Sequence, residues 1–445
     1  MTFLLCLEDR PMKTHAMISA VLLGLGCVCD AKAEDRPYLT TQSPITLFNT
    51  SDGEFEASRT AHRIRPYDYK LKTEDSFTVI HLGPDHPPTV KTVFGTIAAT
   101  ILGPGTMAMS KDGRYAMVTN TGLRPKVGLS SKLSYPTGVP LTNKDLTPDL
   151  LKKQKLSPQL SDMLSVIDLS KKTYPVVQRL LFDDHPINIL THPDGKHFLM
   201  FASRVFYVFR LDDERLFEVS RFPNTYGLGS FWIHPKGDRI FSTQNASTIT
   251  SLTGGKCQAH WFALEDQKIR YLSEVKVAEG VDSAFTDQSF ISRISQDGKW
   301  ALICQRTRGN DRDLCDVLIA DLTLDPPAIT RAIKQVGDGL ENFAFHPNGK
   351  MAVAVCLENT KNSLAVLDIV STPPRLLYHL DAAGTSQGSE FSPDGDKLFV
   401  GSADHGRIEV YDVIADFELR KNQKFIKIGY GHNSLTIGPR YQEKE

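Results

Sequence analysis

The sequence lacks the dense runs of lysine and arginine that characterise nucleic-acid-binding surfaces. Its 51 basic and 52 acidic residues give a formal net charge of −1, so no nucleic-acid partner is expected. It has no CxxCH motif and no CxxC pair with zinc spacing, which excludes covalent c-type haem. It also lacks the GxSxG, P-loop and HExxH motifs, so no common catalytic class is indicated.

Long apolar runs are scarce, and the most prominent one, Met17–Cys29, stands near the N-terminus. It is followed by Ala31-Lys32-Ala33, a small-x-small cleavage pattern. We therefore expect residues 1–33 to be a signal peptide, with Met12 as its start. A lipid anchor at Cys27 and an uncleaved N-terminal anchor are the alternatives. With the signal removed, no transmembrane span remains, so a periplasmic or secreted protein is expected.

Cysteine is rare in the remainder of the chain. Of the seven cysteines, four follow the leader, namely Cys257, Cys304, Cys315 and Cys356. An oxidising compartment permits disulfides. Cys304 and Cys315 are predicted to flank one hairpin loop, and this pair is the candidate disulfide.

Six segments repeat one pattern: an apolar strand, a turn of the form Ser/His-x-Asp/Asn-Gly or a close variant, and a second apolar strand. Proline and Asp or Asn favour such a turn, and glycine takes the positive φ that reverses the chain. The spacings are mostly near the roughly 40–50 residues of a four-stranded propeller blade. The first spacing is longer because it contains an insertion, 123–161. The turn glycines are Gly113, Gly195, Gly237, Gly298, Gly349 and Gly395.

The repeats predict an all-β fold, a seven-bladed β-propeller. Residues 431–439 resemble an innermost strand at which the repeat stops, while 77–82 and 90–97 resemble third and fourth strands that lack their first. Joining the two chain ends in one blade closes the ring and removes an exposed sheet edge. We therefore assign 34–76 to an N-terminal extension and 77–445 to the propeller.

The chain resembles the YVTN-type seven-bladed propellers, a group that includes surface-layer and quinoprotein-like periplasmic proteins. The name motif is retained approximately as Ala116-Met-Val-Thr-Asn120, and the resemblance covers most of 104–412. It implies the fold and leaves the function open, because propellers with one architecture serve many functions.

Residues that precede a first strand or follow a second strand converge around one mouth of a propeller channel. This rule selects a polar ring that can bind a ligand or a divalent metal, or perform acid–base chemistry; the alternative is that these residues only cap strand ends. No cofactor is identified. In contrast, His192, His234 and His346 begin turns at the opposite face and are expected to form local hydrogen bonds. The ligand-binding candidates are His185, Asn188, Arg306, Glu341, Asn342, Glu358, Gln387, His405 and His432.

Two functions follow from this ring. The first is a non-catalytic exported propeller that binds a partner protein or a small ligand at the channel mouth, with the 123–161 insertion as a lid or docking element. The second is a lactonase-type hydrolase or sugar-acid lyase that uses the His, Glu and Arg side chains of the same ring.

The leader makes a direct prediction. When the full chain is produced in a host that exports it, the mature protein should begin at Glu34, as measured by intact mass and N-terminal sequencing. Lipidation at Cys27 would give a heavier, detergent-partitioning product that begins at Cys27, and retention of residues 12–33 would contradict cleavage.

Overall fold

The computed structural model describes most of the chain after residue 36, within a compact unit that runs from Tyr38 to Glu445. The predicted signal peptide, the 123–161 insertion and Glu358 lie outside the described residues. Within the part that is described, no helix has the length and apolarity needed to cross a membrane. The described residues are 37–53, 74–95, 97, 105–120, 163–182, 184–202, 204–225, 228–244, 258–282, 291–306, 314–357, 363–382 and 384–442.

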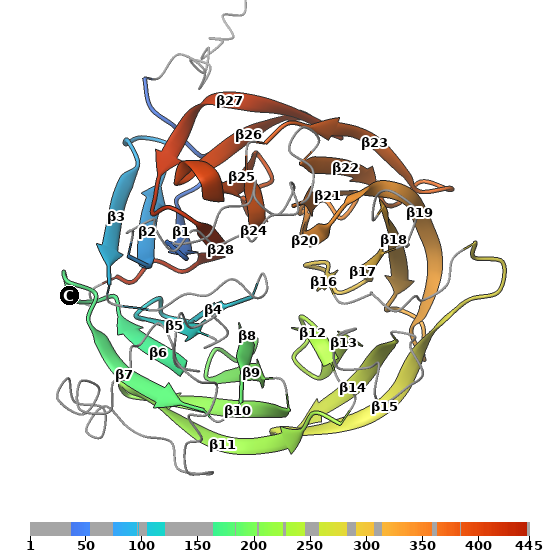
Figure 1. Cartoon of the computed structure of the whole chain (residues 1–445), viewed down its shortest axis with the longest axis horizontal. Coiled ribbons are helices and arrows are strands. Elements are labelled where there is room, and N and C mark those ends of the chain that lie inside the picture. The colour runs from blue at the N-terminus through green and yellow to red at the C-terminus, as the bar shows by residue number, and fades with distance from the viewer. Residues whose placement is uncertain are drawn as a thin grey trace, which may run out of the picture. The chain divides into compact units, whose positions relative to one another are not determined.

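The strands occupy four concentric positions around a ring (Figure 1). The innermost are β4 (Met107–Met109), β8 (Pro186–Thr191), β12 (Leu228–Ile233), β16 (Ser292–Ile294), β20 (Leu340–Phe345), β24 (Thr385–Phe391) and β28 (His432–Gly438). The second strands are β5 (Tyr115–Asn120), β9 (His197–Ala202), β13 (Arg239–Gln244), β17 (Trp300–Arg306), β21 (Met351–Cys356), β25 (Lys397–Ser402) and β1 (Ile45–Ser51).

The third strands are β6 (Met163–Asp168), β10 (Val205–Asp212), β14 (Ala259–Glu265), β18 (Leu314–Asp321), β22 (Leu364–Asp368), β26 (Arg407–Ala415) and β2 (Ser76–Leu82). The outermost are β7 (Val176–Leu181), β11 (Arg215–Pro223), β15 (Lys268–Val277), β19 (Ala328–Asp338), β23 (Arg375–Leu380), β27 (Glu418–Lys427) and β3 (Thr89–Phe94). A short 3-10 helix, η3 (Ala403–His405), links β25 to β26.

The described strands form five four-stranded sheets and one of eight strands. The eight-stranded sheet is two four-stranded groups joined by a short parallel pairing of Lys276 with Ala328 and Val277 with Ile329. Neighbouring innermost strands contact one another around the ring, and β28 contacts β4. The predicted all-β propeller is confirmed. We number the seven four-stranded groups blades 1 to 7, from β4–β7 to the group formed by β28 and β1–β3.

The hydrophobic core lies between blades. Seven apolar clusters of described residues each combine side chains from two neighbouring blades. Between blades 2 and 3, for example, the rings of Phe201, Phe206 and Phe231 lie with centroids 5.2 to 5.8 Å apart. Each buried ring of this kind stabilises the fold by roughly 1.5–3 kcal/mol. Each inner strand packs against a neighbouring blade on both of its faces, so most residues of these strands are buried.

Blade 7 joins the two chain ends, as predicted, but its second strand was missed. β28 pairs with β1, and β1 pairs with β2. β1 lies at Ile45–Ser51, inside the stretch assigned to an N-terminal extension, so this part of the 34–76 assignment is wrong. The predicted strands at 77–82 and 90–97 correspond to β2 and β3. Ile45–Ser51 carries no repeat turn, which explains why the pattern did not reveal it.

The six predicted turns form as the sequence indicates, and their glycines all have φ between 70° and 81°. The turn histidines do more than bond locally. The Nδ1 atom of each accepts the backbone N–H two residues later. The Nε2 atom then bonds the turn-glycine carbonyl of the next blade, at 2.8 Å for His192 to Gly237, 3.2 Å for His234 to Gly298 and 2.9 Å for His346 to Gly395. These bonds connect neighbouring blades.

The predicted disulfide does not form. In the β17–β18 ladder Cys304 pairs with Val317, and Cys315 pairs with Arg306. The two cysteines are therefore diagonal neighbours and not opposite one another, and both are buried thiols in the apolar cluster between blades 4 and 5. The register of the two strands therefore places the cysteines on the ladder in a way that the hairpin argument did not take into account.

The turn geometry predicts a difference between two glycine substitutions. Gly395 and Gly280 have φ of 78° and 81°, so an alanine at either costs about 1–2 kcal/mol for its left-handed backbone. A Cβ at Gly395 lies 2.6 Å from His346 Nε2, whereas a Cβ at Gly280 meets nothing within 4 Å. Gly395→Ala should therefore lose roughly a further 1–3 kcal/mol from overpacking.

Urea unfolding of both variants measures this difference. Equal losses for Gly395→Ala and Gly280→Ala would show that the histidine contact across the blades adds nothing to stability.

Candidate functional site

Three of the nine predicted ligand-binding residues come together at the face where first strands begin and second strands end, which we call the mouth face. Glu341 and Asn342 lie on β20, and Gln387 lies on β24 of the next blade. Gln387 Nε2 donates to Glu341 Oε2 at 3.2 Å. The Asn342 amide donates to the Gln387 carbonyl and, at 3.4 Å, to Ser389 Oγ. These three residues form the mouth cluster.

The mouth cluster carries acceptor atoms that have no partner among the described residues. Asn342 and Gln387 are 2% and 4% exposed, yet Asn342 Oδ1 and Gln387 Oε1 accept no hydrogen bond. Asn188, on β8, has the same property: it is 1% exposed and its Oδ1 is unpaired. A buried polar atom without a partner costs about 1–3 kcal/mol, so such atoms indicate a site for a bound water or a ligand.

His432 is buried, and its ring packs against Gly388, the residue that follows Gln387 of the mouth cluster. It begins β28, is fully buried, and its Nδ1 lies 2.5 Å from Asn49 Oδ1 on β1. The imidazole fits against two glycines of blade 6, since a Cβ at Gly388 or Gly401 would overlap it. Burial lowers the pKa of His432 to about 4. The geometry makes this side chain part of the contact between blades 6 and 7.

The remaining four predicted residues are described only in part. His185 precedes β8 and is partly buried, and its backbone N–H donates to Asp184 Oδ1 at 3.0 Å. His405 is exposed on η3, with its Nδ1 3.1 Å from Ser402 Oγ. Arg306 ends β17, and only its backbone position is described. Glu358 lies outside the described residues. The role of these four residues as ligands stays a prediction.

An ion pair that the sequence did not reveal connects three blades. The Nη2 atom of Arg293 on β16 donates to both carboxylate oxygens of Glu390 on β24, at 2.6 and 2.7 Å. Arg293 also donates to the Phe343 carbonyl of β20 at 2.8 Å, and its guanidinium lies 5.2 Å from the Trp232 ring. Burial raises the pKa of Glu390, although Arg293 acts in the opposite direction. Removing one member would leave a buried charge, which is strongly destabilising.

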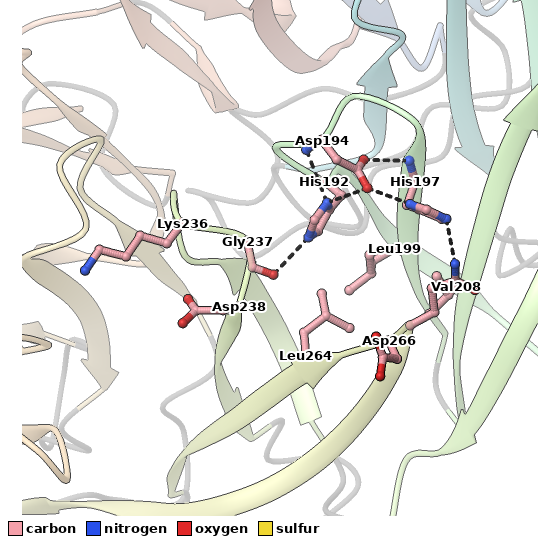
Figure 2. A pocket seen from close by; sticks show the side chains of 11 residues that line it. His192, Asp194, His197, Leu199, Val208, Lys236, Gly237, Asp238, Leu264 and Asp266 are labelled. Atoms are coloured by element: carbon pink, nitrogen blue, oxygen red, sulfur yellow. Dashed lines mark hydrogen bonds and ion pairs between the residues drawn. The ribbon is translucent and has the colours of Figure 1, made fainter.

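A cavity of about 330 Å³ lies at the opposite end of the blades, which we call the turn face, between blades 2 and 3. Its walls include His192, Asp194 and His197 of blade 2 and Lys236, Asp238 and Asp266 of blade 3. Figure 2 shows Asp194 next to both imidazoles. The sequence reasoning assigned His192 only to a turn. The available signal was the segment His192–His197, the one among the six turns with a histidine at both ends.

Comparisons with known proteins show the fold. No protein-family model matches this sequence, and no curated protein matches it. Among solved structures, a periplasmic gluconolactonase of Pseudomonas aeruginosa is 13% identical with a TM-score of 0.54, covering 88% of this chain and 99% of that one. A Bacteroides fragilis protein assigned as a candidate 6-phosphogluconolactonase is 16% identical with a TM-score of 0.55, covering 90% and 99%.

A protein of Lactobacillus plantarum has a TM-score of 0.57 at 8% identity, covering 88% of this chain and 99% of that one. These identities are too low to carry function, so the likeness supports the β-propeller fold alone. The narrower YVTN resemblance stays a prediction.

The burial of His432 predicts a pH dependence of stability. Its pKa is about 4 in the folded chain and about 6.5 in an unfolded chain. The unfolded state therefore binds more protons between these values. The stability that the neutral imidazole confers is fully present above pH 6.5 and is lost as the pH falls towards 4, by up to about 3 kcal/mol.

Urea unfolding of the wild type and His432→Gln at pH 7.0, 5.5 and 4.5 measures the effect. The variant should be less stable at pH 7.0, and the difference should shrink as the pH falls. A difference that stays constant with pH would contradict the buried neutral histidine.

Proposed function

We propose that this chain is an exported β-propeller that binds a small polyhydroxylated ligand at the mouth cluster. The observation that carries the proposal is the pair of buried, unpartnered carboxamide oxygens, Asn342 Oδ1 and Gln387 Oε1. Both are acceptors, and Glu341 adds a carboxylate 3.2 Å from the Gln387 amide nitrogen. A ligand rich in hydroxyl donors satisfies this arrangement, because each donor pairs an oxygen that is otherwise costly to bury.

The rigidity of the surroundings supports binding. Asn342 and Gln387 come from innermost strands of adjacent blades, and both side chains are positioned by hydrogen bonds inside the cluster. The Arg293–Glu390 pair holds the same two strands together, since Arg293 also donates to the Phe343 and Ser389 carbonyls at 2.8 and 3.3 Å. A preorganised acceptor set binds a ligand without ordering cost in the protein.

Lactone hydrolysis is the second candidate, because the similar structures include proteins named as a periplasmic gluconolactonase and a candidate 6-phosphogluconolactonase. Hydrolysis of a lactone requires donors for the oxyanion that develops on the carbonyl. The side-chain amides of the mouth cluster already donate within it, Asn342 to the Gln387 carbonyl and Gln387 to Glu341, so the groups left without a partner are acceptor oxygens. Binding is therefore the better supported function of this cluster.

A pair of matched substitutions tests the proposal. Gln387→Met removes an unpartnered oxygen and should leave the free energy of unfolding within about 1 kcal/mol of wild type. Gln178→Met removes a buried glutamine that bonds both the carbonyl and the N–H of Leu216, at 3.0 and 2.8 Å. It should cost about 1–3 kcal/mol. Only Gln387→Met should abolish the thermal shift that sugars, sugar acids or sugar lactones induce.

Two results would overturn the proposal. If Gln387→Met destabilises the chain as much as Gln178→Met and no panel compound binds, the cluster is structural. If the wild type hydrolyses a sugar lactone above the spontaneous rate in a pH-stat assay, and Glu341→Gln removes this turnover, the protein is a lactonase.

A further inference from the structure

The turn between β8 and β9 brings two imidazoles to one carboxylate. His192 follows β8, Asp194 lies in the turn, and His197 begins β9. Asp194 Oδ2 is 3.1 Å from His192 Nδ1 and 2.6 Å from His197 Nδ1. The imidazole planes are nearly perpendicular, at 83°, with ring centroids 6.3 Å apart. One ligand atom from each of the three residues lies within 4.8 Å of the other two. We call this group the turn triad.

The backbone holds the carboxylate in place. Asp194 Oδ1 accepts the backbone N–H of Lys196 at 2.8 Å and that of His197 at 3.0 Å, which leaves Oδ2 directed at the imidazoles (Figure 2). Burial alone would raise the pKa of Asp194, but the hydrogen bonds from the His197 side chain and from these backbone amides lower it well below its usual range.

The hydrogen bonds of His192 place its Nδ1 beside this carboxylate, where Nδ1 already accepts one backbone N–H. Its Nε2 bonds the Gly237 carbonyl at 2.8 Å; a carbonyl is only an acceptor, so Nε2 carries the proton. Its Nδ1 accepts the Asp194 backbone N–H at 3.2 Å. In the neutral ring, the Nδ1 lone pair thus lies 3.1 Å from a carboxylate oxygen. A cation bound at Nδ1 would replace the bond from the Asp194 backbone N–H and would lie between two atoms that are both acceptors.

The orientation of His192 matches the surroundings that metal-bound histidines have, and that of His197 matches them once the Gln267 amide rotates. A ligating histidine typically donates its other ring N–H to a carbonyl or carboxylate, as His192 does to Gly237. His197 Nε2 lies 3.1 Å from the Gln267 side-chain amide of blade 3. If Nδ1 of His197 binds a metal, its proton moves to Nε2, and rotation of the Gln267 amide presents the oxygen as the acceptor. The His197 imidazole thus keeps one proton throughout this change.

Corresponding turns in other blades lack the same donors. In the His234 turn, Lys236 takes the place of Asp194 and Arg239 that of His197; in the His346 turn, Asn348 and Met351 stand there. All three turns keep the bond from histidine Nε2 to the next glycine carbonyl. The structural role of the turn histidine therefore requires neither Asp194 nor His197.

The triad borders the cavity between blades 2 and 3, so an ion there remains accessible. The side chains of His192, Asp194 and His197 are 19%, 36% and 16% exposed. The opposite wall carries Asp238 and Asp266 as well as Lys236. A volume of about 330 Å³ accommodates water or a small ligand in the remaining coordination positions.

We propose that His192, Asp194 and His197 bind a divalent first-row transition-metal ion, with open coordination positions facing the cavity. Two imidazole nitrogens and one carboxylate oxygen suit Zn²⁺ and its neighbours, whereas Mg²⁺ and Ca²⁺ prefer oxygen ligands. The site is separate from the mouth cluster and does not depend on the function proposed for it.

The test uses the full chain without a histidine tag, stripped with a chelator and titrated with Zn²⁺ in a calorimeter. Wild type should bind one Zn²⁺ at this site and gain thermal stability from it. Asp194→Asn and His197→Gln should each weaken binding by more than about tenfold. Co²⁺ in place of Zn²⁺ should give visible absorption bands in the wild type and lose them in both variants.

His346→Gln is the matched control, since it removes the equivalent bond to Gly395 but none of the proposed ligands. It should lower stability and leave Zn²⁺ affinity unchanged. Circular dichroism of each variant verifies folding, and His197→Gln keeps the assay informative if Asp194→Asn disrupts the turn. Absence of Zn²⁺ binding, or binding that persists unchanged in Asp194→Asn and His197→Gln, would overturn the proposal.

Discussion

Packing of one blade face against the next is the interaction on which this structure depends. No apolar cluster of the described residues belongs to a single blade; each combines side chains from two neighbours. A blade by itself would therefore expose apolar side chains on both faces, and the ring is stable only when every interface is complete. This explains why a polar contact such as Arg293–Glu390 reaches across three blades, and why turn histidines bond the glycine of the next blade.

The same interfaces contain both candidate sites. The mouth cluster lies where blades 5 and 6 meet, and the turn triad borders the gap between blades 2 and 3. Strand backbones inside a blade pair with one another, so polar side chains at the edges of two blades are those that remain available to a ligand. A propeller thus forms sites at its interfaces and not within its sheets.

Local features of the fold could be predicted from the sequence. The turn glycines and the third strands depend on neighbouring residues, and the pattern identified them. Contacts between distant segments could not be predicted in this way. Arg293 and Glu390 are 97 positions apart, and the repeat pattern, which consists of apolar strand residues and turn residues, does not pair charged residues of different blades. Of the ligand ring, Glu341, Asn342 and Gln387 come together, but His432 is buried because Gly388 and Gly401 make space for its ring. Whether Cys304 and Cys315 lie opposite one another depends on the register of their two strands, and the loop length did not reveal that register.

The pairing of β1 with β28 also affects the order in which the chain can fold. His432 and Asn49, which bond across this pair, are 383 positions apart. A chain synthesised from its N-terminus presents the edge of β1 unpaired until the final strand emerges. Leu435 of that strand also completes the apolar cluster between blades 6 and 7. Ring closure therefore requires β28, and a chain that stops before His432 would leave the ring open with one unprotected edge.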